Sequence, residues 1–143
     1  MKRQVFLILA SLSVLVMSAY AQSGGTVIVA KIPFDFIVRD KTLPAGEYTL
    51  TRLAQGVTLI RSRDCSAKMV FQTNTVEAAR TRDELVFHRR GDKYFLSQFW
   101  TAGNSIGSEL RKCRTEEKLQ LERISKADGT LELETVSVLA RQR

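Results

Sequence analysis

The chain has 143 residues and carries 22 Lys and Arg against 15 Asp and Glu, a formal net charge of +7. From this length we expect one domain of ordinary size and no more. His88 is the only histidine, which excludes any site that needs two imidazoles, including the common zinc arrangements.

The first residues predict a secretory signal peptide. Two basic residues precede an uncharged apolar run over residues 5–17, and small residues follow it. Ala19 and Ala21 have the small side chains that signal peptidase admits, so we expect cleavage between Ala21 and Gln22. The apolar run is shorter than the roughly 20 residues of a membrane-spanning helix. We therefore expect export to the periplasm or the extracellular space, with no transmembrane segment after cleavage.

Cleavage would leave residues 22–143 as a single β-rich domain. This mature chain keeps 20 Lys and Arg against 15 Asp and Glu, a net charge of +5. A positive balance favours anionic partners, such as an envelope polysaccharide, phospholipid head groups or the anionic surface of an envelope protein. A solvated surface with a basic excess and no partner is the alternative.

Alternating apolar and polar residues predict strands along the first half of the mature chain. Residues 26–32 are rich in β-branched side chains and are expected to form the first strand. Phe34, Phe36 and Val38 alternate next, and a turn at 44–46 separates them from the alternation that restarts at Tyr48. The sequence therefore predicts a hairpin around Pro44. Further strands are expected over 57–62 and 69–75.

The second half predicts another hairpin, a helix and a last strand. Gly91 lies in a tight turn between strands at 85–89 and 93–100. In the second of these, Tyr94, Leu96 and Trp100 are expected on one face, and Phe95 and Phe99 on the other. Helical spacing predicts a helix over 115–126 with Thr115 as N-cap, ended by Asp128 and Gly129. Residues 131–139 return to strand spacing, and we expect the basic tail 141–143 to fray.

These elements indicate a mainly β fold. Seven or eight short strands, with turns every 8–12 residues, are typical of a single antiparallel β-sandwich or small barrel. The helix at about 115–126 precedes the last strand and would cover an open end or a sheet face.

Three motifs carry a resemblance to known proteins. Leu43 to Leu50 resembles the turn-and-strand signature of prealbumin-like sandwich modules, the type found as carboxypeptidase regulatory domains. Most of the mature chain more closely resembles an uncharacterised group of small secreted bacterial proteins, which combine a signal peptide with the motifs at residues 32–36, 43–48 and 87–96. No activity or catalytic residue is assigned to that group. The resemblance therefore implies architecture and export, but no mechanism.

The two cysteines, Cys65 and Cys113, permit one internal disulfide. An oxidising compartment would allow it to persist, and two free thiols are the alternative. A nucleophile pair would need either cysteine beside His88, which the spacing does not indicate. We expect His88 to face solvent or to pack.

Other residues of chemical interest fit structural roles better than catalysis. Asp35 is expected to point outward or to cap a turn. Glu132 and Glu134 share one face of the last strand, where neighbouring carboxylates usually form a solvated surface. An enzyme would need a constellation of Asp35, Glu47, Tyr48 or His88, which the sequence does not display. We predict no catalytic, metal-binding or cofactor-binding residue.

Basic residues near strand ends could gather on one rim. Together with Tyr94 and Trp100, such a rim could bind a polyanion, although export argues against nucleic acid. The alternative is scattered solubilising charge. The residues of this predicted rim are Arg61, Arg63, Arg80, Arg82, Arg89, Arg90 and Lys93.

The sequence thus predicts an exported, non-enzymatic β-domain that serves as a binding or structural module of the cell envelope. The alternative is a small-ligand carrier of barrel type, in which aromatic side chains line a cavity. Those side chains are Phe34, Phe36, Tyr48, Phe71, Phe87 and Trp100.

Overall fold

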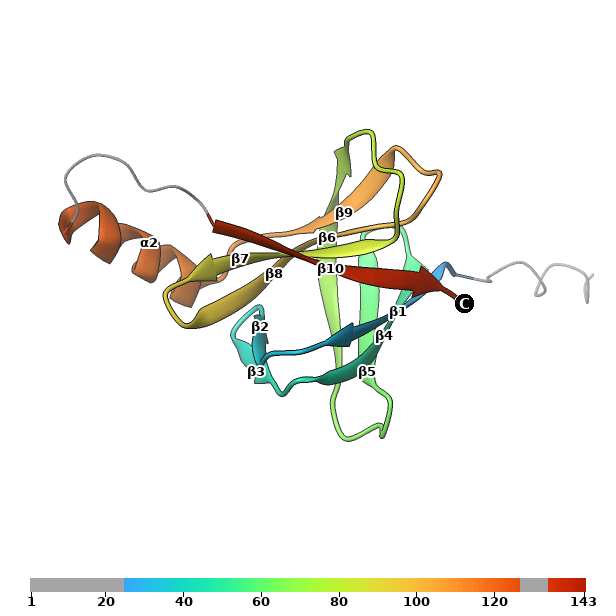
Figure 1. The fold of residues 1–143 in the computed structure, drawn as a ribbon, viewed down its shortest axis with the longest axis horizontal. Helices are drawn as coiled ribbons and strands as arrows, with labels where there is room; N and C mark the ends of the chain where they lie inside the picture. The colour runs from blue at the N-terminus through green and yellow to red at the C-terminus, as the bar shows by residue number, and fades with distance from the viewer. Residues whose placement is uncertain (1–24, 127–133) are drawn as a thin grey trace, which may run out of the picture.

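The computed structural model describes residues 25–126 and 134–143, which form a β-barrel with one helix (Figure 1). The elements are β1 (Val27–Ile32), β2 (Phe36–Val38), β3 (Lys41–Leu43), β4 (Gly46–Ala54), β5 (Val57–Ser62), β6 (Lys68–Glu77), β7 (Glu84–Arg90), β8 (Lys93–Trp100), β9 (Ile106–Leu110), α2 (Arg114–Lys126) and β10 (Glu134–Gln142).

Eight strands close the barrel. Their order around it is β1, β4, β5, β6, β9, β8, β7 and β10, and β10 pairs with β1. Every one of these pairings is antiparallel. The other two strands lie outside the ring, where Ile37 of β2 pairs in parallel with Phe95 of β8. The predicted mainly β fold with one helix before the last strand is confirmed, and its architecture is the barrel.

Alternate side chains of the strands fill the barrel interior. Phe36 meets Tyr48 and Phe87 edge to face, with ring centroids 5.0 and 5.6 Å apart. Each of the three is at most 1% exposed. Burying each such side chain stabilises the fold by about 1.5–3 kcal/mol. Trp100 is equally buried but lies outside this interior cluster.

The stretch around Pro44 does not form the single hairpin that the sequence predicts. β2 and β3 make a short hairpin whose turn holds Arg39 at φ 60°, and β4 pairs with β1 instead. Pro44 has no amide hydrogen, so the ladder ends there. Asp35 is exposed, and its Oδ1 accepts a hydrogen bond from the Ala45 amide at 2.8 Å. The predicted capping role of Asp35 is confirmed.

The second predicted hairpin, β7 with β8, is confirmed, with Gly91 at φ 67° in its turn. A bulge shifts the register so that Ser97 has no partner across β7. As a result, Leu96 and Phe99 both belong to the interior cluster, while Trp100 lies on the opposite face. The predicted faces of Phe99 and Trp100 are therefore wrong.

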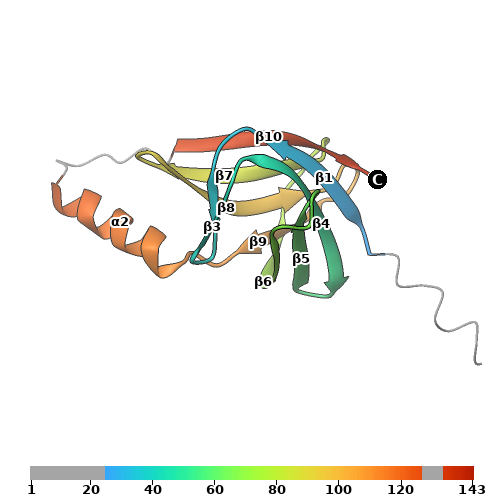
Figure 2. The same ribbon diagram turned by 90° about the horizontal axis from the view of Figure 1, so that it is seen from below.

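Helix α2 begins one residue earlier than predicted and extends away from the barrel (Figure 2). Cys113, and not Thr115, is the N-cap. Its Sγ accepts a hydrogen bond from the Glu116 amide at 3.4 Å, and its carbonyl accepts one from the Glu117 amide at 3.0 Å. The sulfur atom thus takes the place that a hydroxyl or carboxylate oxygen usually holds. The predicted helix end at Asp128 lies outside the described residues.

The C-terminal residues belong to the barrel. Arg141 pairs with Val29, β10 continues to Gln142, and the amide of Arg143 donates to the Val27 carbonyl at 3.1 Å. The predicted fraying of this tail is wrong, because β10 lies between β7 and β1 and its amides complete both ladders.

Candidate functional site

The outward positions of five neighbouring strands form one basic surface. The register places Arg141, Val29, Thr49, Arg61 and Lys68 side by side across β10, β1, β4, β5 and β6. Side chains two positions along a strand share its face, so this row has equally oriented neighbours on either side. The cations on these positions define what we call the cationic face: Lys31, Arg61, Arg63, Lys68, Arg141 and Arg143.

One carboxylate lies within the cationic face. Glu47 pairs in register with Lys31, and its Oε2 lies 3.5 Å from Nη1 of Arg63. The Arg63 side chain is 79% exposed, so this ion pair contributes little to stability. Six cations against one carboxylate leave the face strongly positive.

The cationic face is hollowed between two arginine pairs. A cavity of about 360 Å³ lies between two arginine pairs: Arg61 and Arg63, at the end of β5, and Arg141 and Arg143, at the end of β10. Its floor includes Val29, which is 7% exposed. A second cavity of about 340 Å³ continues it past Lys31 and Leu139 and shares Val29, Glu47 and Arg141 with the first. We call the two together the arginine groove.

The β5–β6 turn holds one wall of the groove in place. Ser62 and Ser66 donate hydrogen bonds to Oδ1 of Asp64 at 2.6 and 2.8 Å. These bonds keep the pKa of Asp64 below its ordinary value of 3.8, so this carboxylate stays ionised. The amide of Arg63 donates to the Glu47 carbonyl at 2.9 Å. The backbone under Arg63 is therefore fixed, while its side chain extends into solvent with only the 3.5 Å ion pair to Glu47.

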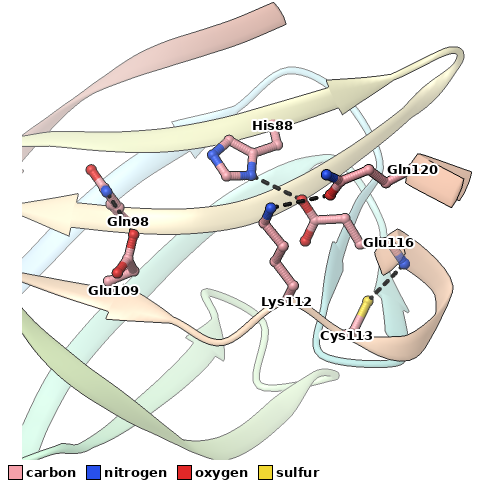
Figure 3. A network of polar contacts seen from close by, with 7 residues as sticks. All are labelled: His88, Gln98, Glu109, Lys112, Cys113, Glu116 and Gln120. Atoms are coloured by element: carbon pink, nitrogen blue, oxygen red, sulfur yellow. Dashed lines mark hydrogen bonds and ion pairs between the residues drawn. The ribbon is translucent and has the colours of Figure 1, made fainter. Parts of the chain in front are cut away.

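A second polar cluster lies where α2 meets the barrel (Figure 3). Nδ1 of His88 lies 2.9 Å from Oε1 of Glu116, and their side chains are 14% and 5% exposed. The cap bond from the Glu116 amide to Cys113 lies beside this pair. His88 thus anchors the first turn of the helix to β7, and its predicted packing role is confirmed.

This cluster does not form an activated nucleophile. Burial raises the pKa of the Cys113 thiol above 9.0, so the sulfur remains protonated at neutral pH. Nδ1 of His88 contacts Glu116, and the Cys113 sulfur accepts the hydrogen bond of the Glu116 amide. The arrangement supports helix attachment and not acyl or thiol chemistry.

The disulfide that the two cysteines permit is not formed. Cys65 is exposed in the β5–β6 turn at φ 60°, whereas Cys113 is buried at the start of α2, and both are free thiols. Figure 1 places the β5–β6 turn and the start of α2 in different parts of the molecule. The alternative of two free thiols is confirmed.

The remaining candidate residues do not converge. The Tyr48 hydroxyl donates to the Pro44 carbonyl at 2.8 Å, and burial raises the pKa of this phenol. Glu134 is exposed and pairs with Arg89 at 2.9 Å. Ala21, Gln22 and Glu132 lie outside the described residues.

The predicted basic rim is divided among several places. Only Arg61 and Arg63 belong to the cationic face. Arg80 lies over the Trp100 ring at 5.3 Å, and Arg89 lies over the Tyr94 ring at 5.7 Å. Arg90 is 6% exposed at the end of β7. The two aromatic residues expected to stack on a ligand thus stack on arginines of this chain instead.

Sequence reasoning missed four members of the cationic face: Lys31, Lys68, Arg141 and Arg143. Their signal was present as basic residues at alternate positions of the sequence, such as Arg141 and Arg143. Their meeting depends on β10 pairing with β1, which joins the last strand to the first. No local pattern predicts that pairing.

Residues 25–126 and 134–143 contain no group of three or more His, Cys, Asp or Glu side chains that could hold a metal ion. Within the same ranges, no helix has the length and apolar character needed to cross a membrane. Comparison of the chain with protein families, curated proteins and solved structures finds no match.

Proposed function

We propose that this chain is an exported, non-enzymatic binding module of the cell envelope, and that it binds an anionic partner through the cationic face. One observation carries the proposal: six basic side chains meet on one surface whose single side-chain carboxylate is that of Glu47. The six stand on four strands, β1, β5, β6 and β10, or directly after their ends. Such a surface attracts anions over a range set by salt and speeds their association.

The environment of the basic side chains supports this role. All six are exposed, and only Arg63 has an ion-pair partner among the described residues. By contrast, Arg80 and Arg89, which lie elsewhere, pair with Glu84 and Glu134 at 2.8 and 2.9 Å. The other five cations of this face therefore have no ion-pair partner among the described residues and are available to bind an anion.

The groups suited to acid, base or nucleophile chemistry support a non-enzymatic role. His88 is engaged with Glu116, and Cys113 caps a helix as a neutral thiol. Neither lines the arginine groove. Export follows from the predicted signal peptide and would bring the cationic face to the acidic polymers and head groups of an envelope.

The test uses the full chain, expressed with its own signal peptide and purified after export. We would measure binding to polygalacturonate and to vesicles of phosphatidylglycerol with phosphatidylcholine, at low and high salt. The groove variant Arg61→Gln/Arg141→Gln is compared with the control Arg82→Gln/Arg111→Gln, which removes the same charge from exposed positions elsewhere.

We expect the exported chain to bind at least one of these anionic materials and to release it as salt rises. Two ion contacts of about 1 kcal/mol each give about a 30-fold loss for the groove variant, while the control stays near the wild type. Equal losses for both variants, or no binding to either material, would refute the proposed function. The mass of the same sample tests cleavage between Ala21 and Gln22.

A further inference from the structure

The arginine groove has the dimensions of a binding site for one extended polymer chain. Its walls lie at the ends of β5 and β10, which are separated by β1 and β4: one wall is Arg61 with Arg63, the other Arg141 with Arg143. Three interstrand spacings give about 14 Å between the two walls, a width that the long arginine side chains narrow from both sides. The axis of the groove follows the strands, because each wall consists of neighbours along one strand.

The shape of the groove favours a polymer chain over a bilayer. Its two cavities together hollow the surface over Val29, which lies below the arginine side chains. A flat layer of head groups would touch the walls and leave this floor without a partner. A chain lying along the strands can contact both walls and the floor at once.

Glu47 indicates that the ligand carries hydrogen-bond donors beside its anionic groups. Its carboxylate lines both cavities of the groove and is 30% exposed. A ligand with only anionic oxygens would be repelled there, whereas a hydroxyl can donate to Glu47 while a neighbouring carboxylate binds an arginine. Thr49 adds a hydroxyl to the floor, and Leu139 adds an exposed apolar side chain at the end.

The side chains that line the groove exclude base stacking. None of them is aromatic. Single-stranded nucleic acids bind basic grooves largely by stacking bases on aromatic rings. A ligand that alternates acidic groups with hydroxyls and has no bases fits these residues better.

We infer that the arginine groove binds an extended segment of an anionic polysaccharide, which lies along β10 and β5 with its acidic groups on the arginine walls and its hydroxyls on Glu47 and Thr49. This inference rests on the proposed function and names the class of partner. Guanidinium groups suit the role, because their planar donors bind carboxylates in pairs.

The test measures binding of the exported full chain to oligogalacturonates of increasing length, with neutral maltooligosaccharides and the phosphatidylglycerol vesicles in parallel. Two variants separate the modes of binding. Arg61→Lys/Arg141→Lys keeps the charge but removes the paired donors of the two guanidinium groups. Glu47→Gln removes one negative charge and the carboxylate acceptor. Circular dichroism and the Arg82→Lys/Arg111→Lys control show whether the variants remain folded and whether the effect is local.

We expect affinity for oligogalacturonates to rise with length and to level off once the groove is covered. The affinity of Arg61→Lys/Arg141→Lys for oligogalacturonates should be about tenfold lower than that of the wild type, and that of Glu47→Gln severalfold lower. Vesicle binding by Glu47→Gln should stay equal or increase, because the repulsion between the Glu47 carboxylate and the anionic head groups is lost. If the same arginines bind vesicles but the oligosaccharides do not bind, the inference of a polysaccharide ligand is refuted and the proposed function still holds. Affinity that is independent of length, or unaffected by Arg→Lys, would also overturn the polysaccharide ligand. Loss of all anion binding would refute both.

Discussion

The contact between Gly107 and Trp100 provides a direct test of the barrel. Gly107 lies on β9, opposite Val76 of β6, and a Cβ added to it would come within 2.5 Å of the Trp100 ring. The ring is 1% exposed, with Arg80 at 5.3 Å, and its Nε1 donates to Gln98 at 3.2 Å. It therefore has little room to move.

We expect Gly107→Ala to lower the free energy of unfolding by about 2 kcal/mol, as overpacking of a well-filled site does. For a domain of this size, that loss lowers Tm by about 8 °C. Thermal unfolding followed by circular dichroism measures it, and urea unfolding followed by fluorescence repeats it, since Trp100 is the only tryptophan.

Gly46→Ala is the matched control. An added Cβ there meets its nearest atom, in the Tyr48 ring, at an ordinary 3.6 Å. The control should stay within about 0.5 kcal/mol of the wild type. In a Trp100→Leu background, the cost of Gly107→Ala should shrink, because the ring that meets the new methyl group is gone. Equal stability of the Gly107 and Gly46 variants, or an unchanged cost in the Leu background, would contradict the placement of β9 against Trp100.

Three further predictions address the thiols and the charges of the β5–β6 region. Under native conditions iodoacetamide should alkylate Cys65 and spare Cys113 until the chain is unfolded, which mass spectrometry of the intact chain reads out; equal labelling would contradict the buried cap. Hydrogen bonds lower the pKa of Asp64 below 3.8, so its ionised form stabilises the fold above that pH. This contribution is lost as the pH falls through the lowered pKa. Urea unfolding should therefore show that Asp64→Ala is less stable than the wild type at neutral pH and equally stable in strong acid. Lys68 stands directly opposite Arg61, so Lys68→Glu should raise the free energy of unfolding by about 0.5 kcal/mol while weakening anion binding, and a variant that is less stable in urea would contradict the register.

Local patterns predicted most elements but not their assembly. Alternation located every strand except β3 and β9, and helical spacing located α2 to within one residue of its start. The bulge at Ser97 was not visible, because one unpaired residue reverses the faces of Phe99 and Trp100 without changing composition. The hairpin expected at Pro44 did not form, because β4 makes a longer ladder of hydrogen bonds with β1 than the short strand β2 could make.

Ring closure also explains why the candidate site escaped sequence reasoning. The arginine groove joins β1 and β4 from the start of the domain to β5 and to the last residues of the chain. The basic residues that sequence reasoning grouped together instead went to different strands and found partners such as Glu84 and Glu134. The pattern of charged residues predicts which strand faces are exposed to solvent, whereas only the register of strand pairing predicts which charged residues lie side by side.

The cationic face is costly for the fold that carries it. Arg61 and Lys68 are directly opposed, and like charges in that position destabilise a sheet. Their repulsion is not offset by burial, because both side chains are exposed. Solubility alone would be served equally well by dispersed charge of mixed sign. The anionic partner that we propose would offset this repulsion when it binds, so the free energy that the like charges cost the fold would be recovered in binding.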